Sequence, residues 1–238
     1  MPYPFKTALL LALVRSSFAG ADPTTNPSIP GKPGVPIELF DGRDLNGWVE
    51  VDRPPTTQKT SPPSTRPASV WTVQNGLIHD AGNPYGYLRT IALSPENFIL
   101  DVEQRHVNKG NGGIFIALTG PDKVWPKEIE IQGLCGDEGD IRNIRLFDFT
   151  ADPARTEPKR IRKIGPSSEK PIGQWDEIRI LVDAGHIEVF VNGVLQNLAW
   201  YRGSLRGHIA LQAEGGEMEF RKVELTSFDE TTGGARPE

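Results

Sequence analysis

The sequence predicts an all-β fold, a two-sheet jelly-roll β-sandwich, and three observations carry that prediction. Short segments with strand-like alternation recur along the chain between turn residues. Of the 238 residues, 25 are glycine and 21 are proline, which favours many turns. No long stretch repeats its apolar residues with the 3.6-residue period of a helix. Roughly a dozen short strands at close spacing are typical of sandwiches and jelly rolls.

The first 35 residues precede the predicted domain. Residues 1–21 resemble an export signal, because Lys6 is followed by an apolar stretch from Thr7 to Val14 and by small residues suited to cleavage. The stretch is too short to cross a bilayer, so no membrane segment is expected once the signal is removed. Residues 22–35 are rich in Pro, Thr and Gly and are expected to form a flexible linker. We therefore expect a periplasmic or secreted protein.

The predicted domain covers residues 36–228. Its clearest local signal is Asn75-Gly76, a type I′ turn pair between the strands 69–73 and 77–79. Residues 53–68 contain five prolines and are expected to form a surface loop, and the polar tail 229–238 is expected to be disordered. Trp48, Trp71 and Trp175 are expected in the core. The strands 177–182 and 186–191 are predicted to form a second hairpin across residues 183–185, and further strands are predicted at 98–105, 114–118, 207–213 and 218–226.

The most informative segment is Trp125-Pro-Lys-Glu-Ile-Glu-Ile-Gln132. A strand here places Glu128, Glu130 and Gln132 on one face and the isoleucines on the other. Two acids and an amide in a row repel one another unless the fold uses them. Two interpretations stay open, a polar cleft that binds sugar or moves protons, and a solvated outer sheet face.

Charge and cysteine content exclude some classes of function. The formal net charge of −5 leaves no basic surface for nucleic acid, and the short basic run 159–163 is typical of a solvated loop. The single cysteine, Cys135, permits no intrachain disulfide and is expected to be a small buried residue.

Several motifs in order resemble one family. Glu38-Leu-Phe-Asp-Gly-Arg-Asp-Leu-Asn-Gly-Trp48 is similar to the opening of the 3-keto-disaccharide hydrolase domain, and matches continue to about residue 227. They include Trp71–Leu77, Gly86–Thr90, Asn111–Ile114, Trp125–Gln132, Gly139-Asp140, Gln174–Asp176, Val191–Gly193, Gly207–Glu214 and Phe220–Val223. The resemblance implies a concanavalin A-like jelly roll. It also implies cleavage of glycosides that carry a ketone at C3. Whether the chain acts alone or beside a sugar 3-dehydrogenase that makes the ketone stays open.

Such a reaction needs a base near C2, a group that holds the enolate, and an acid for the leaving oxygen. The resemblance favours Glu130 for proton transfer, with Glu214 as a second acid and Arg105 or Arg142 at the enolate. Gln132 and Gln212 can bind hydroxyls, since an amide both donates and accepts. The remaining candidate contacts to substrate are Asn111, Trp125 and His106.

Two other functions fit the same residues. A carbohydrate-binding module could use the aromatic and amide side chains without catalysis. The run from Trp125 to Ile131 is also similar to the signature of retaining β-glucanases, but Gly133 stands where that signature ends in its acid/base Glu.

The four histidines are scattered and show no zinc spacing, so the sequence assigns no metal ligand and leaves the need for a metal open. The loop with Asp137, Glu138 and Asp140 could bind Ca²⁺ through oxygen ligands or could be a plain acidic surface loop.

Overall fold

A computed structural model describes residues 32–52, 69–144 and 148–228, and every regular element in these ranges is a β-strand. The expected export signal, most of the linker, the proline-rich loop 53–68 and the tail 229–238 lie outside the described residues. Within the described ranges, no helix has the length and apolarity that spanning a membrane requires.

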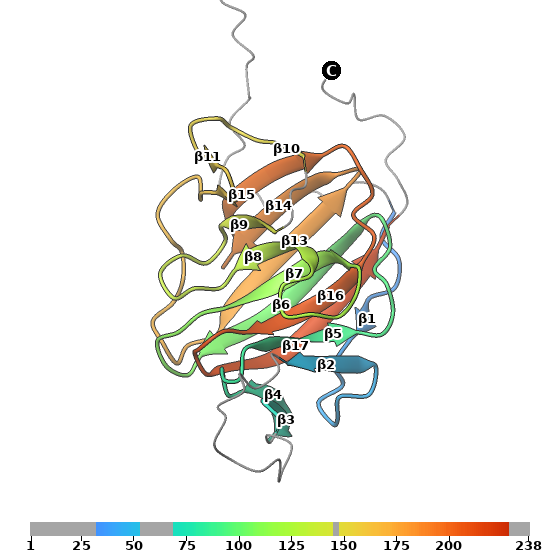
Figure 1. Cartoon of the computed structure of the whole chain (residues 1–238), viewed down its shortest axis with the longest axis vertical. Helices are drawn as coiled ribbons and strands as arrows, with labels where there is room; N and C mark the ends of the chain where they lie inside the picture. The colour runs from blue at the N-terminus through green and yellow to red at the C-terminus, as the bar shows by residue number, and fades with distance from the viewer. Residues whose placement is uncertain (1–31, 53–68, 145–147, 229–238) are drawn as a thin grey trace, which may run out of the picture.

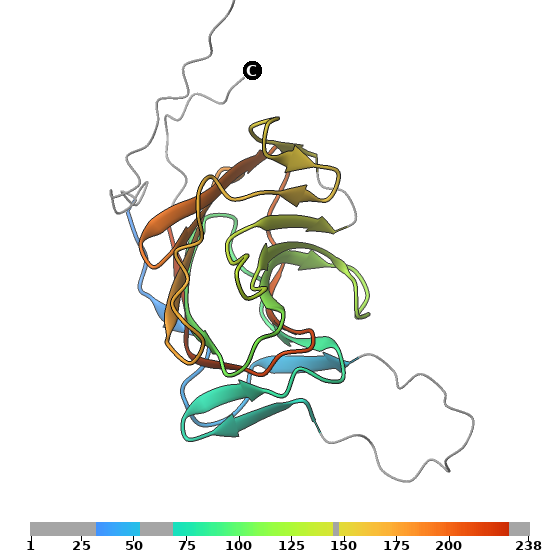
Figure 2. The ribbon, with the colours of Figure 1, turned by 90° about the vertical axis from the view of Figure 1, so that its left-hand side faces the viewer.

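The strands form two antiparallel sheets, visible as two layers in Figure 2. The nine-stranded sheet has β1 (Ile37–Glu38) paired with β17, and its main order is β10 (Phe149–Thr150), β15 (Val194–Tyr201), β14 (His186–Val191), β13 (Asp176–Asp183), β6 (Phe98–His106), β17 (Met218–Ser227), β4 (Leu77–Asp80) and β3 (Trp71–Gln74). The eight-stranded sheet runs β11 (Thr156–Glu157), β12 (Arg160–Ile161), β9 (Ile141–Ile144), β8 (Lys127–Gln132), β7 (Gly112–Thr119), β16 (His208–Ala213), β5 (Gly86–Thr90) and β2 (Trp48–Asp52). Figure 1 shows the layers face on.

The turns follow the predicted chemistry. Asn75 and Gly76 have φ values of 53° and 77°, the two positive angles that a type I′ turn requires. Asn192 and Gly193, at 51° and 76°, repeat the arrangement between β14 and β15. The two predicted hairpins, β3–β4 and β13–β14, are therefore confirmed.

The core lies between the two sheets and is built from alternate residues of their strands. Ile129 and Ile131 of β8 pack there with Ile114 of β7 and Leu211 of β16, and all four are at most 2% exposed. Because side chains alternate, the residues between them point to the outer face of the eight-stranded sheet. That outer face carries the candidate site.

Candidate active site

The polar residues of β8 are buried although they face away from the sandwich core. Glu128, Glu130 and Gln132 are 0%, 3% and 3% exposed. A solvated sheet face would leave these side chains in water, so that interpretation is wrong. Buried acids of this kind must be compensated by partners or keep their protons.

The register of the neighbouring strands brings complementary groups to Glu130. Arg142 of β9 and Phe115 of β7 lie directly opposite it on either side. In the next row Gly113 lies between Gln132 and Gln212. A Cβ atom at Gly113 would lie 2.9 Å from Gln212 Oε1 and 3.2 Å from Glu130 Cγ, so the glycine gives these polar groups room to approach.

Gln132 links the acid to the cation. With the amide oxygen turned toward the guanidinium, Gln132 Nε2 donates to Glu130 Oε1 at 2.6 Å. Its Oε1 accepts from Arg142 Nε at 3.0 Å and from Nη2 at 3.2 Å. The position of the Glu130 carboxyl is therefore held through an amide that Arg142 itself orients.

A second carboxyl lies at the end of β16. Asn111 Nδ2 donates a short hydrogen bond to Glu214 Oε2, and Gln212 Nε2 donates to the same oxygen at 3.2 Å. Gln212 Oε1 is buried and accepts no hydrogen bond from the described residues. This oxygen can accept from a sugar hydroxyl.

The environment disfavours the charged form of both acids. Burial, and then the charge of Glu214, raise the pKa of Glu130 from 4.5 to about 8 against the opposing effect of Arg142. Burial also raises the pKa of Glu214, although Arg142 and the Asn111 hydrogen bond act the other way. On the same sheet face, the buried rings of Tyr87 and Phe115 meet edge to face at 5.8 Å. Raised carboxyl pKa values in a cleft are a frequent mark of functional sites.

The structure thus groups six of the nine predicted site residues, namely Asn111, Glu130, Gln132, Arg142, Gln212 and Glu214. Trp125 is half-buried in the loop that leads into β8. Asp122 of the same loop accepts from Arg89 Nε and Nη2 of β5, both at 2.8 Å, which holds the loop against the outer face. The aromatic pair was not predicted. The sequence pattern could have indicated it, because Tyr87 and Phe115 alternate with core residues on their strands and so face the outer side of the sheet.

Arg105 lies elsewhere, on the outer face of the nine-stranded sheet. Its guanidinium pairs with Glu219 at 2.5 Å and stacks 4.7 Å from the centre of the Trp175 ring. Arg221 stacks on the same ring at 4.5 Å. The core placement of Trp175 is therefore wrong, because two guanidinium groups cover this half-buried ring instead of core side chains. Arg142, and not Arg105, is the arginine that the fold brings to Glu130.

His106 and the acidic loop also lie apart from Glu130. His106 ends β6 and faces Glu138, with Nε2 at 3.3 Å from Oε1. In the acidic loop, Asp137 pairs with Lys163 at 3.0 Å and Asp140 forms a short ion pair with Arg160. Two of the three carboxylates expected for Ca²⁺ are thus neutralised by basic side chains.

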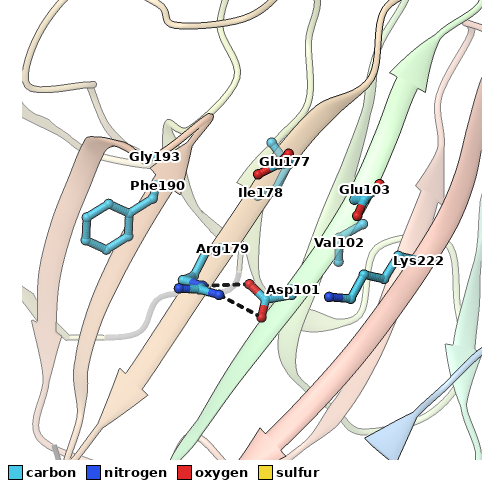
Figure 3. A pocket seen from close by; sticks show the side chains of 9 residues that line it. All are labelled: Asp101, Val102, Glu103, Glu177, Ile178, Arg179, Phe190, Gly193 and Lys222. Atoms are coloured by element: carbon cyan, nitrogen blue, oxygen red, sulfur yellow. Dashed lines mark hydrogen bonds and ion pairs between the residues drawn. The ribbon is translucent and has the colours of Figure 1, made fainter. Parts of the chain in front are cut away.

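A groove of about 250 Å³ opens on the outer face of the nine-stranded sheet. Figure 3 shows Asp101 and Arg179 side by side in it, and Arg179 Nε and Nη2 donate to the two carboxylate oxygens at 2.7 and 3.1 Å. Glu103, also on its lining, pairs with Arg221. Arginines therefore neutralise both of these carboxylates, whereas Glu130, with its raised pKa, is the candidate for proton transfer.

Comparison with known proteins identifies the family and the fold. Residues 35–226 match the model of the 3-keto-alpha-glucoside-1,2-lyase-like domain. A 3-keto-disaccharide hydrolase of Bacteroides thetaiotaomicron is 25% identical over 178 residues, which are 63% of this chain and 53% of that protein. The chain thus spans about half the length of that relative.

Solved structures share the fold. A candidate glycosyl hydrolase of Parabacteroides distasonis aligns with a TM-score of 0.59 and 18% identity over 82% of this chain and 94% of that one. The β-glucanase of Bacillus licheniformis aligns with a TM-score of 0.55 and 15% identity, covering 81% of this chain and 98% of that one. The jelly roll is therefore confirmed, and the family match over most of the chain confirms the resemblance found in the sequence. The chain belongs to the family of 3-keto-alpha-glucoside-1,2-lyase-like domains.

Proposed function

We propose that this protein cleaves glycosides that carry a ketone at C3, by elimination across the C1–C2 bond followed by hydration. The observation that carries the proposal is Glu130, a covered carboxyl with a pKa of about 8. A base with a pKa near the working pH is suited to removing a carbon-bound proton that a neighbouring ketone has made acidic.

In the first step the Glu130 carboxylate removes the C2 proton, and the electron pair of that C–H bond forms the enolate with C3. The enolate then re-forms the ketone, a double bond forms between C1 and C2, and the C1–O bond breaks. The leaving oxygen takes a proton. Water then adds across the double bond, its oxygen to C1 and a proton to C2, which completes hydrolysis.

The other groups match the remaining needs of this sequence. Arg142 supplies the fixed positive charge that can stabilise the enolate oxygen. Glu214, which is half-buried and has a raised pKa, would protonate the leaving oxygen. Gln212 Oε1, which accepts no hydrogen bond from the described residues, can accept one from a sugar hydroxyl, and Trp125 is the candidate for packing against sugar C–H groups.

This function requires that the glycoside is oxidised at C3 before this protein cleaves it. The ketone at C3 must come from a dehydrogenase acting on the C3 hydroxyl of the glycoside. We propose that this supply and the cleavage occur outside the cytoplasm, as the N-terminal segment of the sequence suggests.

The test is product release from 3-keto-trehalose and 3-keto-lactose by the wild type, Glu130→Gln and the control Glu177→Gln, whose carboxyl is exposed on β13. We expect release by the wild type and the control, and a loss of at least about 10²-fold in Glu130→Gln. Glycan binding without release by the wild type would contradict the proposal and favour a carbohydrate-binding module.

A further inference from the structure

A second polar cluster lies inside the sandwich, where β6 ends. It combines His106, the last residue of β6, with Glu138 from the β8–β9 loop and Glu169 from the segment between β12 and β13. One ligand atom from each of the three side chains lies within 4.8 Å of the other two. The chain thus brings one imidazole and two carboxylates together from three separate segments.

Two of the three side chains are deeply buried, and their polar atoms are incompletely used. His106 is 4% exposed, Glu138 is 0% exposed and the adjoining Gln104 is 2% exposed, whereas Glu169 is half-buried. Gln104 Nε2 donates to Glu138 Oε1 at 2.9 Å, but His106 Nδ1, Glu138 Oε2 and Gln104 Oε1 have no hydrogen-bond partner among the described residues. Native folds rarely leave several buried polar atoms unpaired at one place, so the arrangement calls for a further group.

The spacing of the closest pair suits a metal ion. His106 Nε2 and Glu138 Oε1 are 3.3 Å apart and are not aligned as donor and acceptor. Two ligands bound tetrahedrally at about 2.0 to 2.2 Å from an ion are roughly 3.3 to 3.6 Å apart. The pair already has this separation, and the Glu169 carboxylate, within 4.8 Å of both, has to close by at most about an ångström to complete the set.

Negative charge also accumulates here. The carboxylates of Glu138, Glu169 and Asp176 all act on His106. Asp176 accepts from the backbone N–H of Lys170 at 2.8 Å and from Asn192 Nδ2 at 2.6 Å. Glu169 Oε1 accepts from the backbone N–H of Gly136 at 2.9 Å and its Oε2 accepts from Ser167 Oγ at 2.5 Å, so the β8–β9 loop is already held beside it. Because a carboxylate oxygen has more than one lone pair, Glu138 and Glu169 can still bind a cation beside these hydrogen bonds.

We propose that His106, Glu138 and Glu169 bind a divalent transition-metal ion of the zinc type, which fastens β6 to the two loops. An imidazole ligand favours such ions, whereas Ca²⁺ and Mg²⁺ prefer all-oxygen sites. The sequence gives no motif for this site, because the successive ligands lie about 30 residues apart and only one of them is a histidine. The site is separate from Glu130 and does not depend on the function proposed for it.

The test uses the full chain without a polyhistidine tag, stripped with EDTA and dialysed into metal-free buffer. Bound zinc per chain is measured by equilibrium dialysis and elemental analysis, and the melting temperature is recorded with Zn²⁺, Mn²⁺ or Ca²⁺. We expect one tightly bound Zn²⁺ per chain and a higher melting temperature with Zn²⁺ than with Ca²⁺.

Matched variants separate this site from surface binding. Glu138→Gln and the half-buried Glu169→Gln should each weaken Zn²⁺ binding by at least about 100-fold, which exceeds the usual cost of losing an outer partner. His186→Gln and Glu177→Gln, which change exposed side chains, should bind as the wild type does. Circular dichroism identifies any variant that fails to fold. Glu169→Gln carries the lower risk of misfolding, because Glu169 is half-buried whereas Glu138 is fully buried. Three results would overturn the proposal. They are zinc binding that survives both carboxylate changes, no stoichiometric zinc binding by the wild type, and equal stabilisation by Ca²⁺ and Zn²⁺.

Discussion

Replacing Glu130 by Gln should abolish proton transfer and at the same time stabilise the fold at neutral pH. The carboxyl is 3% exposed and its pKa is raised from 4.5 to about 8, mainly by burial and then by Glu214. Below about pH 4.5 the group is protonated in both the folded and the unfolded chain. Between about pH 4.5 and pH 8 the unfolded chain releases the proton and the folded chain keeps it, so rising pH favours unfolding.

The magnitude follows from the size of that window. Each pH unit within it costs the folded state about 1.4 kcal/mol, so the free energy of unfolding falls by about 3 kcal/mol between pH 4.5 and pH 7. Glutamine resembles the protonated acid in shape and carries no proton to lose. Its side-chain oxygen can still accept from Gln132 Nε2, so the variant should avoid this pH-dependent loss and keep the hydrogen bond.

The assay is urea unfolding of the wild type and Glu130→Gln across pH 4.5 to 7.5, with Glu177→Gln as an exposed control. The stability difference for Glu130→Gln should grow from near zero at pH 4.5 to about 3 kcal/mol at pH 7 in favour of the variant. The control should show no comparable trend. A difference for Glu130→Gln that stays flat with pH would refute the reasoning, because it would mean that the buried carboxyl ionises normally.

Three further predictions concern the site and the core. The value of kcat/KM for a 3-keto-glycoside should rise with pH up to about 8, because Glu130 must lose its proton to act as a base; a profile flat from pH 6 to 9 would exclude that role. Gly113→Ala should reduce turnover about ten-fold or more, because the new Cβ atom would crowd Gln212 and Glu130. Gly165→Ala, where the new Cβ atom has open space around it, should leave the rate unchanged, and equal rates in the two variants would contradict the packing described. Ile129→Ala should lower the free energy of unfolding by about 2 to 5 kcal/mol in urea titrations, against at most about 0.5 kcal/mol for the exposed Ile172→Ala; similar losses would mean that β8 does not pack in the core.

Much of the fold was predictable because its signals are local. Strand alternation and paired turn residues need only a few neighbouring positions, so the hairpins β3–β4 and β13–β14 were found directly. The short strands β10 to β12 have two residues each, too few for any period to show, and they depend on partners far along the chain. Such elements are set by tertiary pairing and not by their own residues.

The candidate site was predictable where residues share a strand. Glu130 and Gln132 lie two apart on β8, and Gln212 and Glu214 lie two apart at β16, so each pair shares a face. Choosing between Arg105 and Arg142 required the sheet register, which only the fold supplies. The burial of Glu130 likewise depends on the neighbouring strands, which place Phe115 and Arg142 beside it, and the His106 cluster depends on three distant segments.

The central claim is that Glu130 removes the proton at C2, and hydrogen exchange at that carbon tests it most directly. The wild type, Glu130→Gln and an enzyme-free control would each cleave or incubate a 3-keto-glycoside in D₂O, with C2 followed by NMR. The account predicts that each turnover by the wild type yields either the C1–C2 unsaturated product or a hydrated sugar with deuterium at C2, well above both controls. A hydrolysed product that keeps its original hydrogen at C2 would contradict the account, because it would show that the C1–O bond breaks without proton abstraction.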